Sequence, residues 1–133
     1  MFTLVQTVQI QMSTNKQQQC VLVVDDHPQV LRFLEIDLKL RGFRVITTTS
    51  GEEALGIIRS EDPDIMLLDI IMPGIDGLEV LRRLRDFSPL PVIAFSASYG
   101  NHDDALRLGA NDFVTKPFHP DEITTRIKTL LED

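Results

Sequence analysis

The sequence predicts an α/β fold, a doubly wound three-layer sandwich in which helices cover both faces of a five-stranded parallel sheet. Two observations support this prediction. Five short apolar runs alternate along the chain with five segments of helical pattern, which is the order of right-handed βαβ units. The run 20–24 is continuously apolar, as expected for a strand buried on both faces. A chain of 133 residues suits one domain with a real core.

The expected strands are short apolar runs, at 20–24, 43–47, 64–69, 91–96 and 112–115. The expected helices lie between and after them, at 28–40, 50–60, 77–87, 101–108 and around 123–131. Pro28 falls in the first turn of its helix and Gly42 just past its end. Ser50 and Glu53 have the spacing of a capping box. Gly109 is the expected stop of the short fourth helix.

Residues 1–19 have a different character. Apolar side chains occupy even positions among Thr and Gln, from Phe2 to Met12, which is a half-buried strand pattern broken at Gln6. Three interpretations stay open: an extra strand, a disordered tail, or an extension upstream of a chain that begins at Met12. We expect a peripheral or disordered N-terminal extension at 1–19, and a folded domain at 20–133.

The composition limits the classes of partner and compartment. The net charge is -7, so the chain is not expected to bind nucleic acid directly, which requires neutralising phosphates with Lys and Arg. No apolar stretch is long enough to span a membrane, and no signal peptide is recognisable. The single cysteine, Cys20, opens an apolar run and reads as a small buried hydrophobe. Together these features predict a cytoplasmic protein.

Polar side chains end four of the five predicted strands. Asp25 and Asp26 follow the first strand, Asp69 ends the third, Ser96 ends the fourth, and Lys116 follows the fifth. Each residue alone has an ordinary explanation, such as a helix cap, a turn or a surface lysine. The carboxyl ends of parallel strands lie on one edge of the sheet, where such folds bind ligands. The agreement of four strand ends therefore predicts a functional site.

The residue types at this edge favour phosphoryl chemistry. Three crowded carboxylates repel one another unless a cation lies among them, and an incomplete set of oxygen ligands suits Mg²⁺, or Mn²⁺ in its place. His27 is expected to be an ordinary first-turn helix residue. Lys116 adds a fixed positive charge, Ser96 can hydrogen-bond a phosphate oxygen, and Asp69 is then the nucleophile that forms an acyl phosphate.

At these residues the chain resembles the receiver domain of two-component response regulators, the CheY-like superfamily. The resemblance extends from Val21 to about Leu131 and rests on "VLVVDDH", "DIMLLDIIMPGIDG", "VIAFSAS" and "GANDFVTKPF", in that order. It implies a sheet of strand order 2-1-3-4-5. It also implies that a sensor histidine kinase, or a histidine phosphotransfer protein, donates the phosphoryl group in a phosphorelay.

The resemblance implies a role for each site residue. Asp69 is the expected phosphoacceptor, and Lys116 pairs with the phosphate. Asp26 and Asp69 are the expected direct ligands of Mg²⁺, together with the backbone carbonyl of Ile71, while Asp25 acts through a coordinated water. The apolar Ile71 side chain cannot orient an attacking water, so self-dephosphorylation is expected to be slow.

The resemblance also implies a conformational switch. Ser96 is the expected switch hydroxyl, and Phe113 occupies the place of the switch aromatic, although a plain core role for its ring stays open. Pro73 and Gly74 shape the loop beside the acceptor, and the peptide bond that precedes Pro117 is cis. Phosphorylation is then expected to rearrange the face formed by the fourth helix, fifth strand and fifth helix, which binds a downstream partner.

Two further expectations concern assembly. Asp112 and Arg126 can pair on that face, as in receivers that form homodimers on phosphorylation, but the fourth helix lacks the basic residue of a full ion-pair set. The chain ends at Asp133, soon after its last helix, so it is either a stand-alone receiver or the receiver part of a longer regulator.

Three rival classes fit less well. A flavodoxin-like module needs a phosphate-cradling loop after the first strand, where this chain has Asp25-Asp26-His27-Pro28. An aspartate-based phosphohydrolase needs a second Asp two residues after the nucleophile, where this chain has Ile71. A structural pseudo-receiver is expected to lack some of the charged site residues. The chain is therefore not expected to be a turnover enzyme.

Overall fold

The computed structural model describes residues 18–132. Its single sheet contains five parallel strands in the order β2-β1-β3-β4-β5. The strands are β1 (Cys20–Val24), β2 (Arg44–Thr48), β3 (Ile65–Asp69), β4 (Val92–Ser96) and β5 (Asp112–Thr115). The helices are α2 (Pro28–Leu40), α3 (Gly51–Glu61), α4 (Gly77–Arg85), the 3-10 turn η1 (Tyr99–Asn101), α5 (His102–Arg107) and α6 (Pro120–Leu131).

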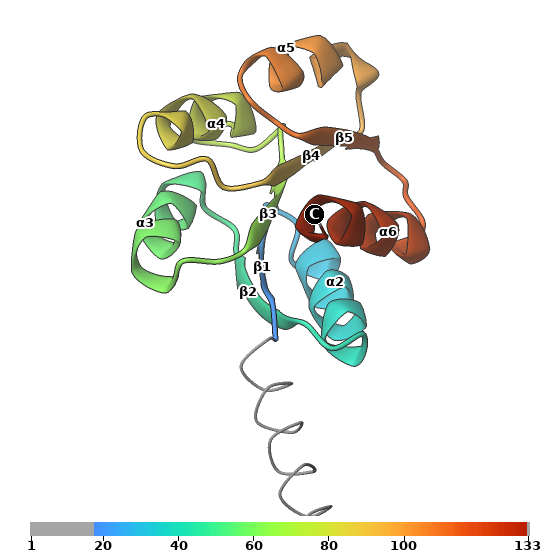
Figure 1. Cartoon of the computed structure of the whole chain (residues 1–133). Coiled ribbons are helices and arrows are strands. Elements are labelled where there is room, and N and C mark those ends of the chain that lie inside the picture. Colours follow the sequence, from blue (N-terminus) through green and yellow to red (C-terminus); the bar gives the residue numbers. More distant parts are fainter. Residues whose placement is uncertain (1–17, 133) are drawn as a thin grey trace, which may run out of the picture.

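The helices form two layers on opposite faces of the sheet. In Figure 1, α2 and α6 lie together on one side of the strands, whereas α3, α4 and α5 lie on the other side. Each layer has its own apolar core against the sheet, one around Leu34, Leu67 and Ile127 and the other around Leu68, Leu81 and Ala105. The three central strands are buried along their whole length. Their apolar sequences follow from this double cover.

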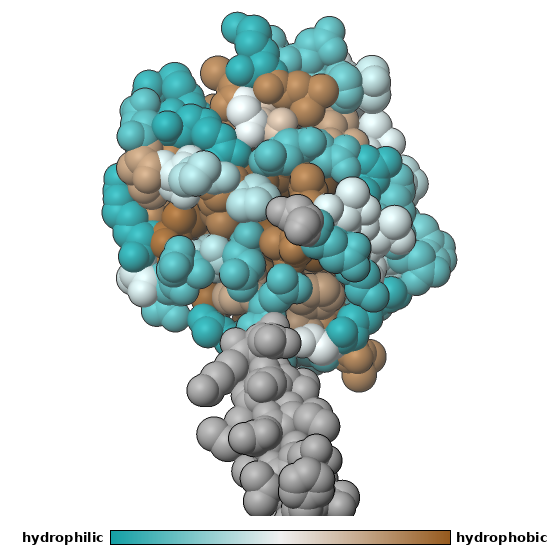
Figure 2. Space-filling view, viewed as in Figure 1, coloured by the Kyte–Doolittle hydropathy of each residue, from teal (hydrophilic) through white to brown (hydrophobic). Residues whose placement is uncertain are grey.

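The structure confirms the predicted fold class, strand order and parallel pairing. Each of the five predicted strands is present, with ends that differ from the predicted ones by one residue at most. The predictions for 1–17 lie outside the described residues, and Gln18 and Gln19 precede β1. No helix in the described part of the chain is long and apolar enough to cross a membrane. In the view of Figure 2 the surface is mainly hydrophilic, with smaller hydrophobic patches.

The helix ends follow local sequence, with two exceptions. Gly42 and Gly109 have positive φ angles of 97° and 111° next to helix ends, as their predicted stopping roles require. The prediction for His27 was wrong by one position, since it is the N-cap of α2 rather than a residue of its first turn. The Ser50 side chain accepts from the Glu53 amide, but the Glu53 carboxylate accepts from the Thr48 hydroxyl instead of closing a capping box.

The fourth predicted helix begins earlier and is less regular than expected. The Ser98 hydroxyl accepts a hydrogen bond from the Gly100 amide and starts the turn η1, after which α5 has only six residues. Ser98 is thus the N-cap of this region, in place of the predicted start at Asn101. Cys20 is buried, as predicted, and burial raises the pKa of its thiol.

Candidate functional site

The predicted charged residues meet at the carboxyl edge of the sheet. Because β1 and β3 are neighbours, Asp25 and Asp26 lie beside Asp69, and ligand atoms of these residues and His27 all lie within 4.8 Å of one another. Asp25 and Asp69 are almost completely buried. The sheet order therefore places three carboxylates in one small volume, although residues 25–64 separate the two strands in sequence.

Lys116 carries the positive charge of this site. Its Nζ donates to Asp25 Oδ2 at 2.8 Å and to Asp69 Oδ2 at 3.4 Å. The ammonium also lies 4.9 Å from the centre of the Phe95 ring. Lys116 follows β5, at the far end of the sheet, so its long side chain reaches across the tip of β4 to the acidic pair. No sequence pattern predicted this contact with the aromatic ring.

Burial and the neighbouring Asp25 carboxylate disfavour the ionised form of Asp69. Its burial, with 2 % of the residue exposed, and the neighbouring Asp25 charge raise the pKa of Asp69 from 3.8 to about 6, while Lys116 and the Ile71 amide oppose the rise. The Ile71 amide donates to Asp69 Oδ1 at 3.2 Å. A second positive charge at this position would therefore relieve a real repulsion.

The other two acidic side chains show where such a charge fits. Asp25 Oδ1 accepts from the His27 amide at 2.8 Å and lies 2.9 Å from His27 Nδ1. Asp26 Oδ1 is buried and has no hydrogen-bond partner among the described residues; His27 Nδ1 lies 3.2 Å away but is directed to Asp25. A buried carboxylate oxygen without a donor, next to further oxygens, fits a hard divalent cation such as Mg²⁺. The contact of His27 with both aspartates was not foreseen from the sequence.

The loop after β3 is held close to the acceptor position. A Cβ added to Gly77 would lie 2.5 Å from the Asp69 carbonyl oxygen, so only glycine permits this approach of α4. The Gly77 amide donates to the Ile70 carbonyl at 2.9 Å. Gly74 has a φ of 77°, which fits its predicted place in the turn after Pro73. The Ile71 side chain is 54 % exposed beside the acidic cluster.

The fourth and fifth strands contribute neutral groups, Ser96 at the carboxyl end of β4 and Phe113 two residues before the end of β5. Ser96 is fully buried, and its Oγ accepts from the Ser98 amide at 3.1 Å and from Asn101 Nδ2 at 3.4 Å. Phe113 is buried in the apolar core on the α3, α4 and α5 side, and its ring also contacts Tyr99 and His102. The sequence pointed to Ser96 and Phe113 but gave no signal for Asn101.

Two other predicted features, a cis peptide bond and an ion pair, are present. The Lys116–Pro117 peptide bond is cis. Arg126 Nη1 donates to Asp112 Oδ1 at 2.6 Å.

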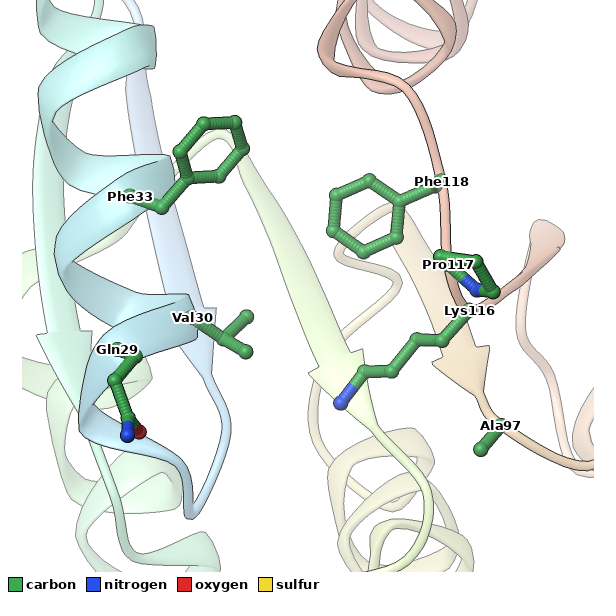
Figure 3. A pocket seen from close by; sticks show the side chains of 7 residues that line it. All are labelled: Gln29, Val30, Phe33, Ala97, Lys116, Pro117 and Phe118. Carbon is green, nitrogen blue, oxygen red and sulfur yellow. The ribbon is translucent and has the colours of Figure 1, made fainter.

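Beside the site, a hollow of about 470 Å³ lies between α2 and the segment after β5, lined by Gln29, Val30, Phe33, Ala97, Lys116, Pro117 and Phe118. Figure 3 shows Val30 and Phe33 on the helix facing Phe118 and Lys116 across this hollow.

A buried acidic cluster, a bridging lysine and a buried serine at the carboxyl edge of a 2-1-3-4-5 sheet define the class of CheY-like α/β domains. The family model of the response regulator receiver domain matches residues 21–128. The chain belongs to this family, whose members act in two-component signalling, and it is a receiver domain rather than a classical enzyme.

Relatives with curated names are transcriptional regulators. The chain is 42 % identical over 122 residues to the probable transcriptional regulator ycf27 of Cyanophora paradoxa. The alignment covers 90 % of this chain and 50 % of the relative. It is 44 % identical over 110 residues to the transcriptional regulatory protein KdpE of Mycobacterium tuberculosis. That alignment covers 81 % of this chain and 49 % of KdpE. The chain thus spans about half the length of these relatives.

Solved structures agree with the fold. The receiver domain of the Francisella response regulator 1452 superposes with a TM-score of 0.80 at 34 % identity, over 85 % of this chain and 96 % of that one. The response regulator TrrA of Thermotoga maritima, solved in complex with Mg²⁺ and BeF, superposes with a TM-score of 0.80 at 36 % identity, over 86 % of this chain and all of that one.

Proposed function

We propose that Asp69 accepts a phosphoryl group and that the chain is a phosphorylation-dependent switch. The observation that carries the proposal is the position of the Asp69 carboxylate, buried between two further aspartates and 3.4 Å from Lys116 Nζ. In the transfer from a phosphohistidine, an Asp69 oxygen forms the new bond to phosphorus. The bond from phosphorus to the imidazole nitrogen breaks, and its electron pair stays on the nitrogen.

The chain's own residues would prepare this transfer. Asp25, Asp26 and Asp69, with the Ile71 backbone carbonyl, would hold Mg²⁺ or Mn²⁺; when bound, the ion neutralises charge on the carboxylate and the incoming phosphate. Lys116 keeps one positive charge within reach of Asp69 before and after the reaction. The fully buried Ser96 hydroxyl would then turn toward a phosphate oxygen.

The switch would report through the face of α5, β5 and α6. Phe113 would move as Ser96 moves, and the Asp112–Arg126 ion pair lies on the same face, where a homodimer would form on phosphorylation. We propose a cytoplasmic receiver domain at 20–133, with the segment 1–19 peripheral to it. The family match at 21–128 supports these bounds.

The phosphodonor would be a sensor histidine kinase or a histidine phosphotransfer protein. The apolar hollow beside Lys116 gives such a donor a surface next to the acceptor (Figure 3). Because the relatives are transcriptional regulators, a longer protein that contains this receiver would control transcription. These relatives give no support to the expectation that the protein avoids nucleic acid. The apolar Ile71 side chain favours slow loss of the phosphate over enzymatic turnover.

Incubation with acetyl phosphate, with and without Mg²⁺, tests the proposal. Intact-mass measurement should show the gain of one phosphate only with Mg²⁺, and no gain in Asp69→Asn. Asp62→Asn is the matched control: it changes an exposed aspartate whose left-handed conformation asparagine also adopts, and it should keep the gain. A folded wild-type chain without the gain would refute the proposal.

A further inference from the structure

One short segment contacts both residues that the proposed switch must move. Residues 98–102 follow β4 and include the turn η1 and the first residue of α5. At one point of the segment, the Asn101 side-chain amide donates to Ser96 Oγ, and the Ser98 amide donates to the same oxygen. At another, the rings of Tyr99 and His102 lie against Phe113. Ser96 and Phe113 are on different strands, so this segment links them directly.

The aromatic contacts form a closed group of three rings. Tyr99 and His102 are stacked, with ring centres 4.6 Å apart and an angle of 15° between the planes. His102 meets Phe113 edge to face at 5.3 Å, and Tyr99 meets it edge to face at 6.0 Å. Phe113 is 7 % exposed and Tyr99 is 64 % exposed. The outer rings therefore cover the inner one, and such pairs are stabilising.

The chain order makes the two contacts dependent on each other. Asn101 directly precedes His102, and together they form the junction of η1 with α5. In the proposed switch, the Ser96 hydroxyl would turn toward Asp69 and would give up the hydrogen bond from the Asn101 amide. A Phe113 ring that moves inward leaves the His102 and Tyr99 rings. Each movement would remove a contact of the same five-residue segment. Loss of the contact with Ser96 would therefore weaken the contact with Phe113, and the reverse.

We propose that Asn101, Tyr99 and His102 are positioning residues that form a latch, which holds Ser96 and Phe113 in their unphosphorylated arrangement. The latch deepens the proposed function, on which its role in signalling rests. It sets the population of the unphosphorylated arrangement before any phosphate binds.

The chain carries its own probe for the latch. Tyr99 is the only tyrosine and the sequence has no tryptophan, so tyrosine emission comes from the latch alone. At one fixed pH, His102→Ala should change Tyr99 emission and iodide quenching directly, because it removes the stacked ring. Asn101→Ala should change both in the same direction, although its amide contacts Ser96 rather than the tyrosine ring.

Arg107→Ala is the matched control on α5, because the Arg107 side chain pairs with Asp104 and not with the switch residues. It should leave Tyr99 emission unchanged. His102→Phe keeps an aromatic ring in the stack and should preserve the quenching of Tyr99. If Asn101→Ala leaves emission and quenching at the wild-type values while His102→Ala changes them, the two contacts are independent and the latch is refuted.

The second measurement uses a phosphate analogue. With Mg²⁺, Asn101→Ala should lower the beryllofluoride concentration needed for half-maximal change about five-fold, the equivalent of ~1 kcal/mol for one lost hydrogen bond. An unchanged or raised midpoint would overturn the latch. If the wild type itself does not respond to beryllofluoride or acetyl phosphate, the proposed function fails, while the Tyr99 comparison in the unliganded chain still decides whether the latch exists.

Discussion

The two halves of the site differ in charge and in how well their polar groups are satisfied. The half at the tips of β1 and β3 holds three carboxylates, with a raised Asp69 pKa and an Asp26 oxygen that has no hydrogen-bond partner in the described part of the chain. The half formed by β4 and β5 holds Ser96 at the tip of β4 and Phe113 two residues before the end of β5, and both are neutral and satisfied by hydrogen bonds or ring contacts. Binding of a cation or a proton stabilises the first half, because it reduces the repulsion between carboxylates. The second half can move only if existing hydrogen bonds or ring contacts break.

Lys116 connects the two halves, and its removal should have the largest effect. Lys116→Met leaves Asp25 and Asp69 buried without a cation, which should lower the unfolding free energy by ~3–5 kcal/mol at pH 7 without Mg²⁺. Urea unfolding measures this loss. Lys39→Met is the matched control, because its exposed pair with Glu35 contributes ~0.5 kcal/mol or less. Equal losses of unfolding free energy in the two variants would show that the buried contacts of Lys116 contribute no more than the exposed pair of Lys39.

Removal of the strained carboxylate should have the opposite sign. The Asp69 pKa is raised in the folded state, so its contribution to stability is fully present below the unfolded-state pKa near 4 and is lost as pH rises through about 6. Asp69→Asn lacks this loss. Relative to wild type without Mg²⁺, its unfolding free energy should therefore gain ~3 kcal/mol between pH 4 and pH 7. Parallel pH profiles for the two proteins would show that Asp69 is not strained.

A cation should relieve the same strain. Mg²⁺ at about 100 times its dissociation constant should raise the unfolding free energy of the wild type by ~2.7 kcal/mol. Asp26→Asn should remove most of this gain, because Asp26 Oδ1 is buried and has no hydrogen-bond partner within residues 18–132. Asp37→Asn changes a half-buried aspartate of α2 that pairs with Arg41 away from the site, and it should keep the gain. Equal gains in all three proteins would place the metal elsewhere.

The smallest expected effect concerns the lifetime of the phosphate. Ile71→Asn replaces an exposed apolar side chain beside the acceptor with one that can orient a water. The half-life of the phosphorylated chain should shorten several-fold, as expected when a positioned polar group assists a hydrolysis that was otherwise unassisted. Intact mass measured over time reports it. Ile71→Val keeps the apolar character and should leave the half-life near that of the wild type; an unchanged half-life in Ile71→Asn would reject the role of Ile71.

The acidic half could be predicted from sequence more completely than the neutral half. Asp25, Asp26, Asp69 and Lys116 each end or follow a segment whose pattern predicts a strand, so the parallel topology is enough to bring them together. The contact of Asn101 with Ser96 depends on the turn η1, whose N-cap is Ser98 and which precedes the predicted helix start. The His27 contacts likewise depend on its position as N-cap, which the helix pattern alone placed one residue wrongly.

The sequence by itself determined the order of elements, the two-sided burial of the sheet and the residue types at its reactive edge, because apolar runs and caps are local signals. Only the tertiary structure decided which charges touch, since the Lys116 ammonium must cross the tip of β4 to reach Asp25. It also decided the Asp69 pKa and the three-ring contact at Phe113, because burial and ring geometry arise from packing between strands and loops that are distant in sequence.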